Sequence, residues 1–270
     1  ALWIENMNTV LDDNMTLCLA NGERIKLKQE MKCLFEVMDL STASPATVSR
    51  IGVVYMTPSD LGYLPYVQSW LNGPISTAPE MPEPIKNHFF SLIGQLFAPA
   101  LKYQRKKCSE PIECVDVQLV TSLTMLFQSL FTAPKGVDFS ASEDKLKSQC
   151  SKCFVFCLIW SVGGSIGHTD WAHFNDFMRD LIGEELPDMK FPNQDTIFDY
   201  FVDLAENDFK NWSTIVPAFE PEVGMSYFAM VVPTSDTVRF SFLMRSLIEV
   251  NKPVFMTGVT GTGKTTVIEK

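Results

Sequence analysis

The sequence predicts an α/β fold with an all-helical subdomain in its middle. Two nearly continuous apolar runs, 33–38 and 51–56, are typical of strands that are buried on both faces of a parallel sheet. Apolar residues at helical spacing follow from about 59 to 188. Near the C-terminus a short β-branched and aromatic run, 254–257, precedes a glycine-rich pattern. The expected organisation is part of one sheet domain in 1–58, a helical unit in 59–188, a connector with strands in 189–236 and the start of a second sheet domain in 237–270.

A helix and a β-hairpin are predicted before the first strand of this sheet. Apolar residues at helical spacing predict a helix over the first eleven residues, ended by the polar run that follows it. Asn21-Gly22 is a strong hairpin signal, and it predicts that Leu17 and Leu19 face Ile25 and Leu27.

Five amphipathic helices are expected in the helical unit. Their apolar stripes are at 66, 67, 70 and 71; 85, 89, 92, 93 and 96; 119, 123, 126, 127 and 130; 146, 150, 153, 154, 157 and 158; and 171, 174, 177, 178 and 181. We expect the second helix to stop near Pro99, the fourth at Gly163-Gly164 and the fifth at Gly183, because proline and glycine end helices.

The last 80 residues return to strand signals. The run 227–232 predicts a strand, and 233–236 predicts a turn into a helix that Asp236 caps. Phe240, Leu243 and Leu247 are its expected buried stripe.

Composition limits the class of protein. With 270 residues, of which 46% are hydrophobic, the chain can form one large core or two modest ones. The net charge of -10 argues against a nucleic-acid or anionic-membrane partner, and the longest apolar run, 153–160, is too short to span a bilayer. Seven cysteines without a secretory signal at the start indicate free thiols in a reducing compartment.

The pattern G-x-x-x-x-G-K-T at 258–265 predicts a phosphate-binding loop, since a strand precedes it and a helix follows. Glycines allow the backbone N–H groups to point at phosphate oxygens, which the N-terminal end of the helix also attracts. In such a loop Lys264 contacts the β- and γ-phosphates of ATP and Thr265 binds Mg²⁺. The alternative is a glycine-rich turn that matches by chance.

Arg50 is a second candidate. An arginine just before a buried strand of an ATPase-like sheet can reach into a neighbouring nucleotide site and stabilise the transferring phosphate. Spacing alone equally allows an ordinary surface or salt-bridged arginine. Asp39, at the end of the preceding run, is either a polar sensor or a residue that starts a loop.

The cysteines and histidines predict no metal site. Cys150, Cys153 and Cys157 share one helix face, where free cysteine behaves as a small core residue. His168 and His173 are five residues apart, which does not match the i, i+4 spacing of helical zinc ligands.

Five runs together resemble the dynein heavy chain family, a motor whose AAA+ modules are fused into one polypeptide ring. Residues 1–14 resemble the helix after the acidic strand of the second module, 44–50 a loop of that module and 154–164 its helical lid. Residues 232–239 and 258–265 resemble the start of the third module, and 35–42 is more similar to axonemal than to cytoplasmic heavy chains.

The resemblance implies roles for individual residues. Arg50 matches the position of an arginine finger that acts in trans on the ATP site of the first module. The loop of the third module corresponds to Gly258, Val259, Thr260, Gly261, Thr262, Gly263, Lys264, Thr265 and Thr266, with ATP or ADP and Mg²⁺ as cofactors. Val232, Pro233 and Thr234 correspond to the segment beside the adenine.

The resemblance further implies an ATP-driven microtubule motor in the cytoplasm, the cytoskeleton and the axoneme of cilia. Its partners would be microtubules, intermediate and light chains, and the neighbouring modules of the same chain. We expect the 270 residues alone not to turn over ATP, because no pocket in them is complete. Two alternatives are a segment of another AAA+ remodelling ATPase and a ring scaffold that binds nucleotide without catalysis.

Overall fold

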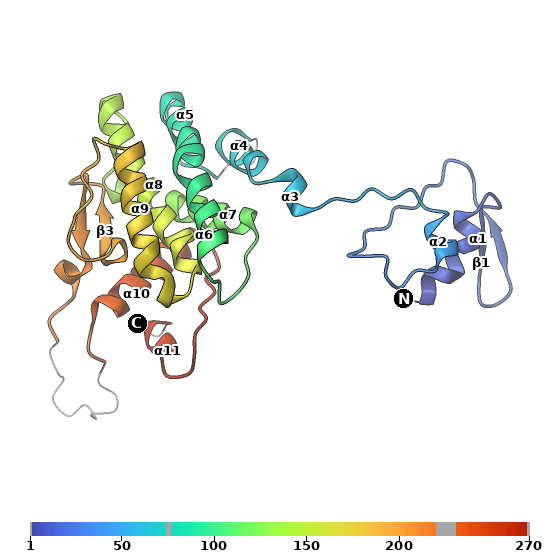
Figure 1. The fold of residues 1–270 in the computed structure, drawn as a ribbon. Helices are drawn as coiled ribbons and strands as arrows, with labels where there is room; N and C mark the ends of the chain where they lie inside the picture. Colours follow the sequence, from blue (N-terminus) through green and yellow to red (C-terminus); the bar gives the residue numbers. More distant parts are fainter. Residues whose placement is uncertain (1, 74–76, 220–230, 269–270) are drawn as a thin grey trace. The chain divides into compact units, whose positions relative to one another are not determined.

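The computed structural model describes residues 2–73, 77–219 and 231–268. The chain divides into two units, Ala1–Thr57 and Pro58–Lys270 (Figure 1). Among the described helices, none combines the length and the apolar composition needed to cross a membrane.

The first unit contains short elements: η1 (Leu2–Met7), α1 (Asn8–Leu11), β1 (Thr16–Cys18), β2 (Arg24–Lys26) and α2 (Pro45–Val48). The predicted N-terminal helix and the hairpin are confirmed, with Leu17 opposite Ile25. The expected partners of Leu19 and Leu27 are wrong. The N–H of Leu19 donates to the carbonyl of Glu23, and that of Leu27 donates to Met15, because the loop contains three residues and ends at a glycine with positive φ.

The predicted parallel strands do not form. Residues 33–38, 51–56 and 254–257 have no regular structure, and Leu34 and Met38 are 97% and 100% exposed. Of the predicted strand 227–232, residues 227–230 lie outside the described residues, and 231–232 are irregular. A strand of a parallel sheet needs hydrogen-bonded neighbours and cover on both faces. The described part of the chain provides neither beside these runs, since its ladders are the two hairpins β1–β2 and β3–β4.

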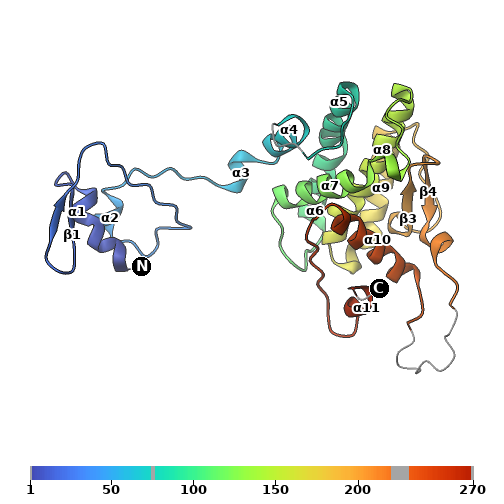
Figure 2. The same cartoon turned by 180° about the vertical axis from the view of Figure 1, so that it is seen from behind.

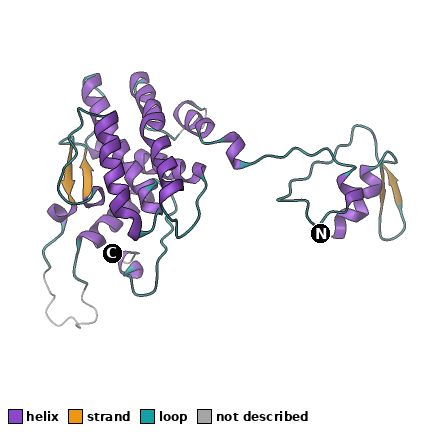
Figure 3. Cartoon of the chain, viewed as in Figure 1, coloured by secondary structure: helices purple, strands orange, loops and turns teal. Residues whose placement is uncertain are grey.

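The second unit is mainly helical (Figure 3). Its longer helices are α4 (Leu64–Asn72), α5 (Glu83–Leu92), α6 (Ala98–Lys107), α7 (Asp116–Leu130), α8 (Glu143–Ser161), α9 (Trp171–Glu185) and α10 (Ser235–Glu249), and its short ones are α3 (Pro58–Leu61), η3 (Ala133–Lys135), η4 (Gly163–Ser165), η5 (His168–Asp170), η6 (Ile197–Asp199), η7 (Trp212–Ile215) and α11 (Lys264–Ile268). All five predicted helices are therefore present, although α9 continues two residues beyond Gly183.

Helix α8 is the centre of the core. Every residue from 150 to 159 except Lys152 is buried, which is the pattern of a helix that is covered on all sides. Helices α5 and α7 pack against it. The ring of Phe89 lies 4.8 Å from that of Phe127 and 5.2 Å from that of Phe154, between ring centroids. Complete burial of each such side chain contributes about 1.5–3 kcal/mol.

The prediction that the second helix stops near Pro99 is wrong. A π-helical turn, η2 (Ile93–Phe97), joins α5 to α6, and the N–H of Ala98 donates to the carbonyl of Ile93, five residues earlier. Pairs of buried residues recur every four positions, at 92/93, 96/97 and 100/101. Four residues exceed one α-helical turn by roughly 40°. The wider turn absorbs this excess and makes room for the proline, which has no N–H to lose.

The core continues past the helices into a hairpin that the sequence did not predict. β3 (Tyr200–Asp203) pairs antiparallel with β4 (Asp208–Asn211), and the turn between them has Asn207 at φ 52°. Trp212 follows the hairpin, is fully buried, and donates from Nε1 to the carbonyl of Phe198 at 3.0 Å. Helix α10 then lies at one end of the helical bundle and contacts α7 (Figure 2).

Candidate functional site

The glycine-rich loop leads directly into a helix. Gly261 and Gly263 have φ values of 85° and 79°, in the left-handed region that favours glycine. Helix α11 begins at Lys264, and the N–H of Val267 donates to the carbonyl of Gly263 at 3.1 Å. The loop therefore has the backbone turns that the glycine pattern calls for.

The ammonium group of Lys264 is folded over this loop. Its Nζ lies 2.9 Å from the carbonyl oxygen of Gly258 and 2.7 Å from that of Val259. The hydroxyl of Thr262 also donates to the carbonyl of Val259, at 2.9 Å. Thr265 is exposed at the start of α11, so its hydroxyl is open to solvent. The ammonium group thus bonds to carbonyl oxygens at the start of the loop.

The segment before α10 lies near α11. A cavity of about 500 Å³ is lined by Val231, Pro233 and Thr266, together with one face of α10. Val232 is 55% exposed and is not among the lining residues. Pro233 from one predicted segment and Thr266 from the other therefore line one cavity, whose walls combine apolar side chains with polar and charged ones.

The predicted cap of α10 is wrong. The N-cap is Thr234, whose Oγ1 accepts from the N–H of Thr237 at 3.2 Å, while Oγ1 of Thr237 accepts from the N–H of Thr234 at 2.8 Å. Asp236 lies within the first turn and pairs with Arg239 instead. Threonine and aspartate are both favoured as N-caps, so residue type alone did not identify Thr234 as the cap.

Arg50 follows the short helix α2 in the first unit. Its Nη1 donates to the carbonyl of Ala46 at 2.7 Å, and its Nη2 lies 3.6 Å from the carboxylate of Asp12. The side chain is 31% exposed, and such a pair at the surface contributes about 0–1 kcal/mol. The guanidinium is therefore held only weakly within its own unit.

Glu5 anchors the loop that precedes Arg50, and the sequence reasoning missed it. Its carboxylate accepts from the N–H of Ser44 at 3.1 Å, the hydroxyl of Ser44 at 3.0 Å and the hydroxyl of Thr47 at 3.2 Å. The side-chain amide of Asn8 adds a fourth bond at 3.2 Å. The hydrogen bonds from Ser44, more than any other cause, lower the pKa of Glu5 below its usual value. A lone carboxylate in the apolar run 2–7 was the only signal.

Asp39 forms a local turn. Its carboxylate accepts from the N–H of Ser41 at 2.8 Å and from the hydroxyl of the same residue, and these bonds lower the pKa of Asp39. The contacts are those of a residue that starts a loop.

The three cysteines of α8 are core residues, as predicted. Cys150, Cys153 and Cys157 are fully buried, and burial raises the pKa of the first two thiols well above the usual value. In the described residues, no three histidine, cysteine or acidic side chains are grouped so as to hold a metal ion. The ring of His173 lies instead between the hydroxyl of Tyr103 and the carboxylate of Asp170, at 3.2 Å from each.

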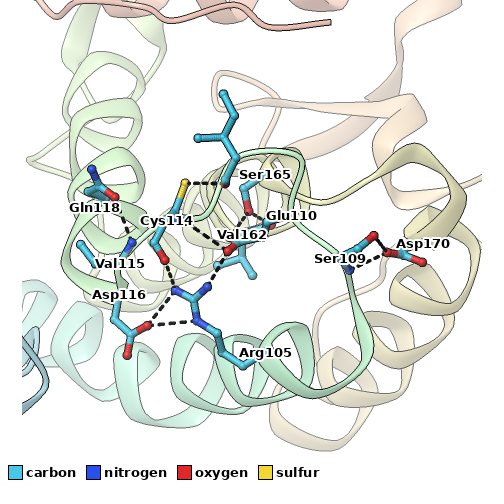
Figure 4. A network of polar contacts seen from close by, with 11 residues as sticks. Arg105, Ser109, Glu110, Cys114, Val115, Asp116, Gln118, Val162, Ser165 and Asp170 are labelled. Carbon is cyan, nitrogen blue, oxygen red and sulfur yellow. Dashed lines mark hydrogen bonds and ion pairs between the residues drawn. The ribbon is translucent and has the colours of Figure 1, made fainter.

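A charged cluster forms around Arg105, near the end of α6 (Figure 4). The guanidinium contacts Glu110 at 2.6 Å, Asp116 at 2.8 Å and the carbonyl of Cys114 at 2.5 Å. Each contact closes the loop between α6 and α7. The arrangement therefore accounts for the arginine as a structural residue.

Comparisons with known proteins match almost the whole chain. The family model described as the dynein heavy chain AAA lid domain matches residues 87–214, and that of the P-loop containing dynein motor region matches 219–270. The chain is 40% identical over 267 residues to dynein axonemal heavy chain 6 of Homo sapiens and 37% identical over 269 residues to dynein axonemal heavy chain 2 of the same species. It is 34% identical over 297 residues to the dynein-1-beta heavy chain, flagellar inner arm I1 complex, of Chlamydomonas reinhardtii. Each alignment covers 99% of this chain and 6% of the relative, so the chain spans a small part of their length.

Proposed function

This chain belongs to the dynein heavy chain family, and from that premise we propose that it supplies two parts of an ATP-driven axonemal motor. The first is an arginine finger, Arg50, for the ATP site of the preceding AAA+ module. The second is the phosphate-binding loop 258–265 of the following module. The whole heavy chain would couple ATP hydrolysis to movement along microtubules in the axoneme, together with intermediate and light chains.

The single observation that carries the nucleotide-binding role is the position of Lys264. Its ammonium lies over a glycine loop with two left-handed glycines, and the helix starts at the same residue. This combination matches what a phosphate loop requires. Mg²⁺ would be bound by the hydroxyl of Thr265 and would neutralise charge on the β- and γ-phosphates.

The cavity beside α10 supports a place for the adenine. Pro233 and Thr266 line it, and its walls offer apolar contacts for a planar base together with polar side chains that can bond to the edge of the base. The proposal thus puts the phosphates on the loop 258–265 and the base toward Pro233.

The finger role of Arg50 rests on the contrast between the contacts of its loop and those of its guanidinium. Glu5 holds the start of the loop 44–50 through three hydrogen bonds, whereas the guanidinium itself has one hydrogen bond to the carbonyl of Ala46 and one exposed ion pair. A firmly held loop with a weakly held charge at its end suits an arginine that inserts into a neighbouring site.

The nucleotide site can be tested in the full-length heavy chain by photolabelling with 8-azido-ATP and mapping of the labelled peptides. We expect label on the peptide that contains Pro233, and we expect Lys264→Ala to remove it, since the phosphates lose their cation. Lys190→Ala, an exposed lysine elsewhere in the second unit, is the matched control. Label on this peptide that persists in Lys264→Ala would refute the role of the loop.

The finger can be tested by microtubule-stimulated ATP turnover of the same protein. Arg50→Ala is expected to slow turnover by about 10³-fold or more, because an arginine finger stabilises charge only in the transition state. Arg24→Ala removes an exposed arginine from β2 of the same unit and serves as the control. Equal turnover in the two variants would make Arg50 an ordinary surface residue.

A further inference from the structure

Two sequence motifs meet in the second unit, and the proposed function uses only the first residues of one of them. One is 159–164, at the end of α8, and the other is 232–239, at the start of α10. Arg239 joins them: its guanidinium carbon lies 5.9 Å from the ring centroid of Trp160 on α8 and 5.2 Å from that of Trp171 on α9. Its side chain is only 9% exposed. A cation this close to two indole rings is attracted by their negative faces.

The charge of Arg239 is compensated from two directions. Nη2 lies 2.5 Å from the carboxylate of Asp236, one turn earlier in α10. Nη1 lies 3.6 Å from the carboxylate of Asp199, at the end of η6. A buried guanidinium is costly unless its charge is paired, so its position depends on both helices at once.

The cluster around Arg239 has little free space. The ring of Trp171 stacks on that of Phe198 at 4.0 Å between centroids and 16° between planes. Phe198 is fully buried and packs so close to Gly163 that a Cβ there would lie 3.0 Å from the ring. A displacement of Arg239 must therefore move Trp171, Phe198 or the end of α8.

The N-cap of α10, five residues before Arg239, borders the candidate nucleotide site. Thr234 caps α10, and Pro233 lines the cavity with Thr266 of α11. From Thr234 to Arg239 the helix advances by about 7.5 Å, and an α-helix is stiff over such a length. A ligand that shifts Pro233 therefore shifts Arg239.

We propose that Arg239 is a positioning residue that couples nucleotide at the loop 258–265 to the aromatic cluster formed by Trp160, Trp171 and Phe198. This inference rests on the proposed nucleotide site. Arginine suits the role better than lysine because its flat guanidinium lies on an indole ring while its edge pairs with carboxylates. Nucleotide that moves the start of α10 would thereby alter the packing between α8 and α9.

Hydrogen–deuterium exchange of the full-length heavy chain, with and without ATP, tests both the nucleotide site and the coupling through Arg239. In the wild type we expect ATP to slow exchange in the loop 258–266 and also in 158–175. In Arg239→Ala we expect saturating ATP still to protect the loop, while the effect on 158–175 is lost. Lys264→Ala should lose both effects. Lys106→Ala, which removes an exposed positive charge from the end of α6, should keep both.

The outcomes separate the two proposals. Protection of 158–175 that survives in Arg239→Ala, with the loop also protected, overturns the coupling role and leaves the nucleotide site intact. A loop that ATP does not protect in the wild type overturns the nucleotide site and the coupling with it. If Arg239→Ala does not fold, Arg239→Lys takes its place with the same criteria. Its ammonium can pair with Asp236 but cannot lie flat on Trp171.

Discussion

Replacing Gly163 by alanine tests how tightly the aromatic cluster is packed. A Cβ at this position would lie 2.7 Å from Cε1 of Phe174 and 3.0 Å from Cε1 and Cζ of Phe198. Two carbon atoms are best separated by about 3.5–4.0 Å, so a ring must move by about 1 Å. Both rings are fully buried, which leaves them nowhere to go without displacing other side chains. Overpacking of this kind costs about 1–3 kcal/mol.

The adjacent glycine is the matched control. A Cβ on Gly164 would lie 3.6 Å from Cε3 of Trp160, an ordinary contact, and the residue is exposed. Because Gly164 does not have a positive φ, alanine there restricts mainly the unfolded chain and stabilises by about 0.4–1 kcal/mol. Gly163 also lacks a positive φ, so this gain is common to both variants, and they are expected to differ by the overpacking cost of roughly 1–3 kcal/mol, with Gly163→Ala the less stable.

Urea-induced unfolding of the 270-residue chain, followed by tryptophan fluorescence, measures this difference. The midpoints can be compared directly if the slope of the free energy of unfolding against urea is the same in both variants. The reasoning is refuted if Gly163→Ala unfolds at the same urea concentration as Gly164→Ala or at a higher one. In that case the rings have more freedom than their contacts imply, and Phe198 cannot transmit a displacement of Trp171.

Two further predictions concern single titratable groups. Glu5→Gln replaces an acceptor of four hydrogen bonds by a group that also donates, so we expect faster amide exchange at Ser44. Because Arg50 then loses its support, we also expect microtubule-stimulated ATP turnover to fall by on the order of tenfold to a hundredfold. Glu30→Gln changes an exposed carboxylate and should alter neither quantity. Burial, and secondly the charge of a lysine on α8, lowers the pKa of His88 below its ordinary 6.5. The folded state then binds fewer protons than the unfolded state as pH falls through 6.5, so stability is lost below that pH. We expect the urea midpoint to fall more between pH 7.5 and 5.5 in the wild type than in His88→Gln, and an equal fall in both would contradict this reasoning.

Local patterns were enough to predict most of the helical unit. The stripe at 119, 123, 126, 127 and 130 is buried at every position, because a helix that covers a core needs only its own periodicity. The run 51–56 has an equally clear strand pattern, yet Val54 is 85% exposed and irregular. A strand depends on neighbours that local sequence does not specify, and the described chain does not place them beside it.

The candidate sites divide in the same way. The residues of the loop 258–265 are contiguous in the sequence, so their spacing alone predicted the loop. The anchor Glu5 lies 39 residues from Ser44, and Arg239 lies 40 residues from Asp199. Only the fold brings such pairs together. Sequence spacing therefore predicted a contiguous loop and missed the pairs that form only when the chain folds.

The π-helical turn between α5 and α6 makes this segment the place where the helical run can lose a residue without losing its register. From Glu83 to Lys107 the chain is one helical run, and the buried pairs stay on one face only because a single turn holds an additional residue. Deleting one residue from 93–97 would allow an ordinary α-helix. The residues that follow would keep their phase, because the deletion removes only the residue that the wider turn had accommodated, and Leu101 would still face the core. A one-residue gap is thus absorbed at this turn, whereas the same gap within α5 or α6 would rotate the rest of the helical run by roughly 100°.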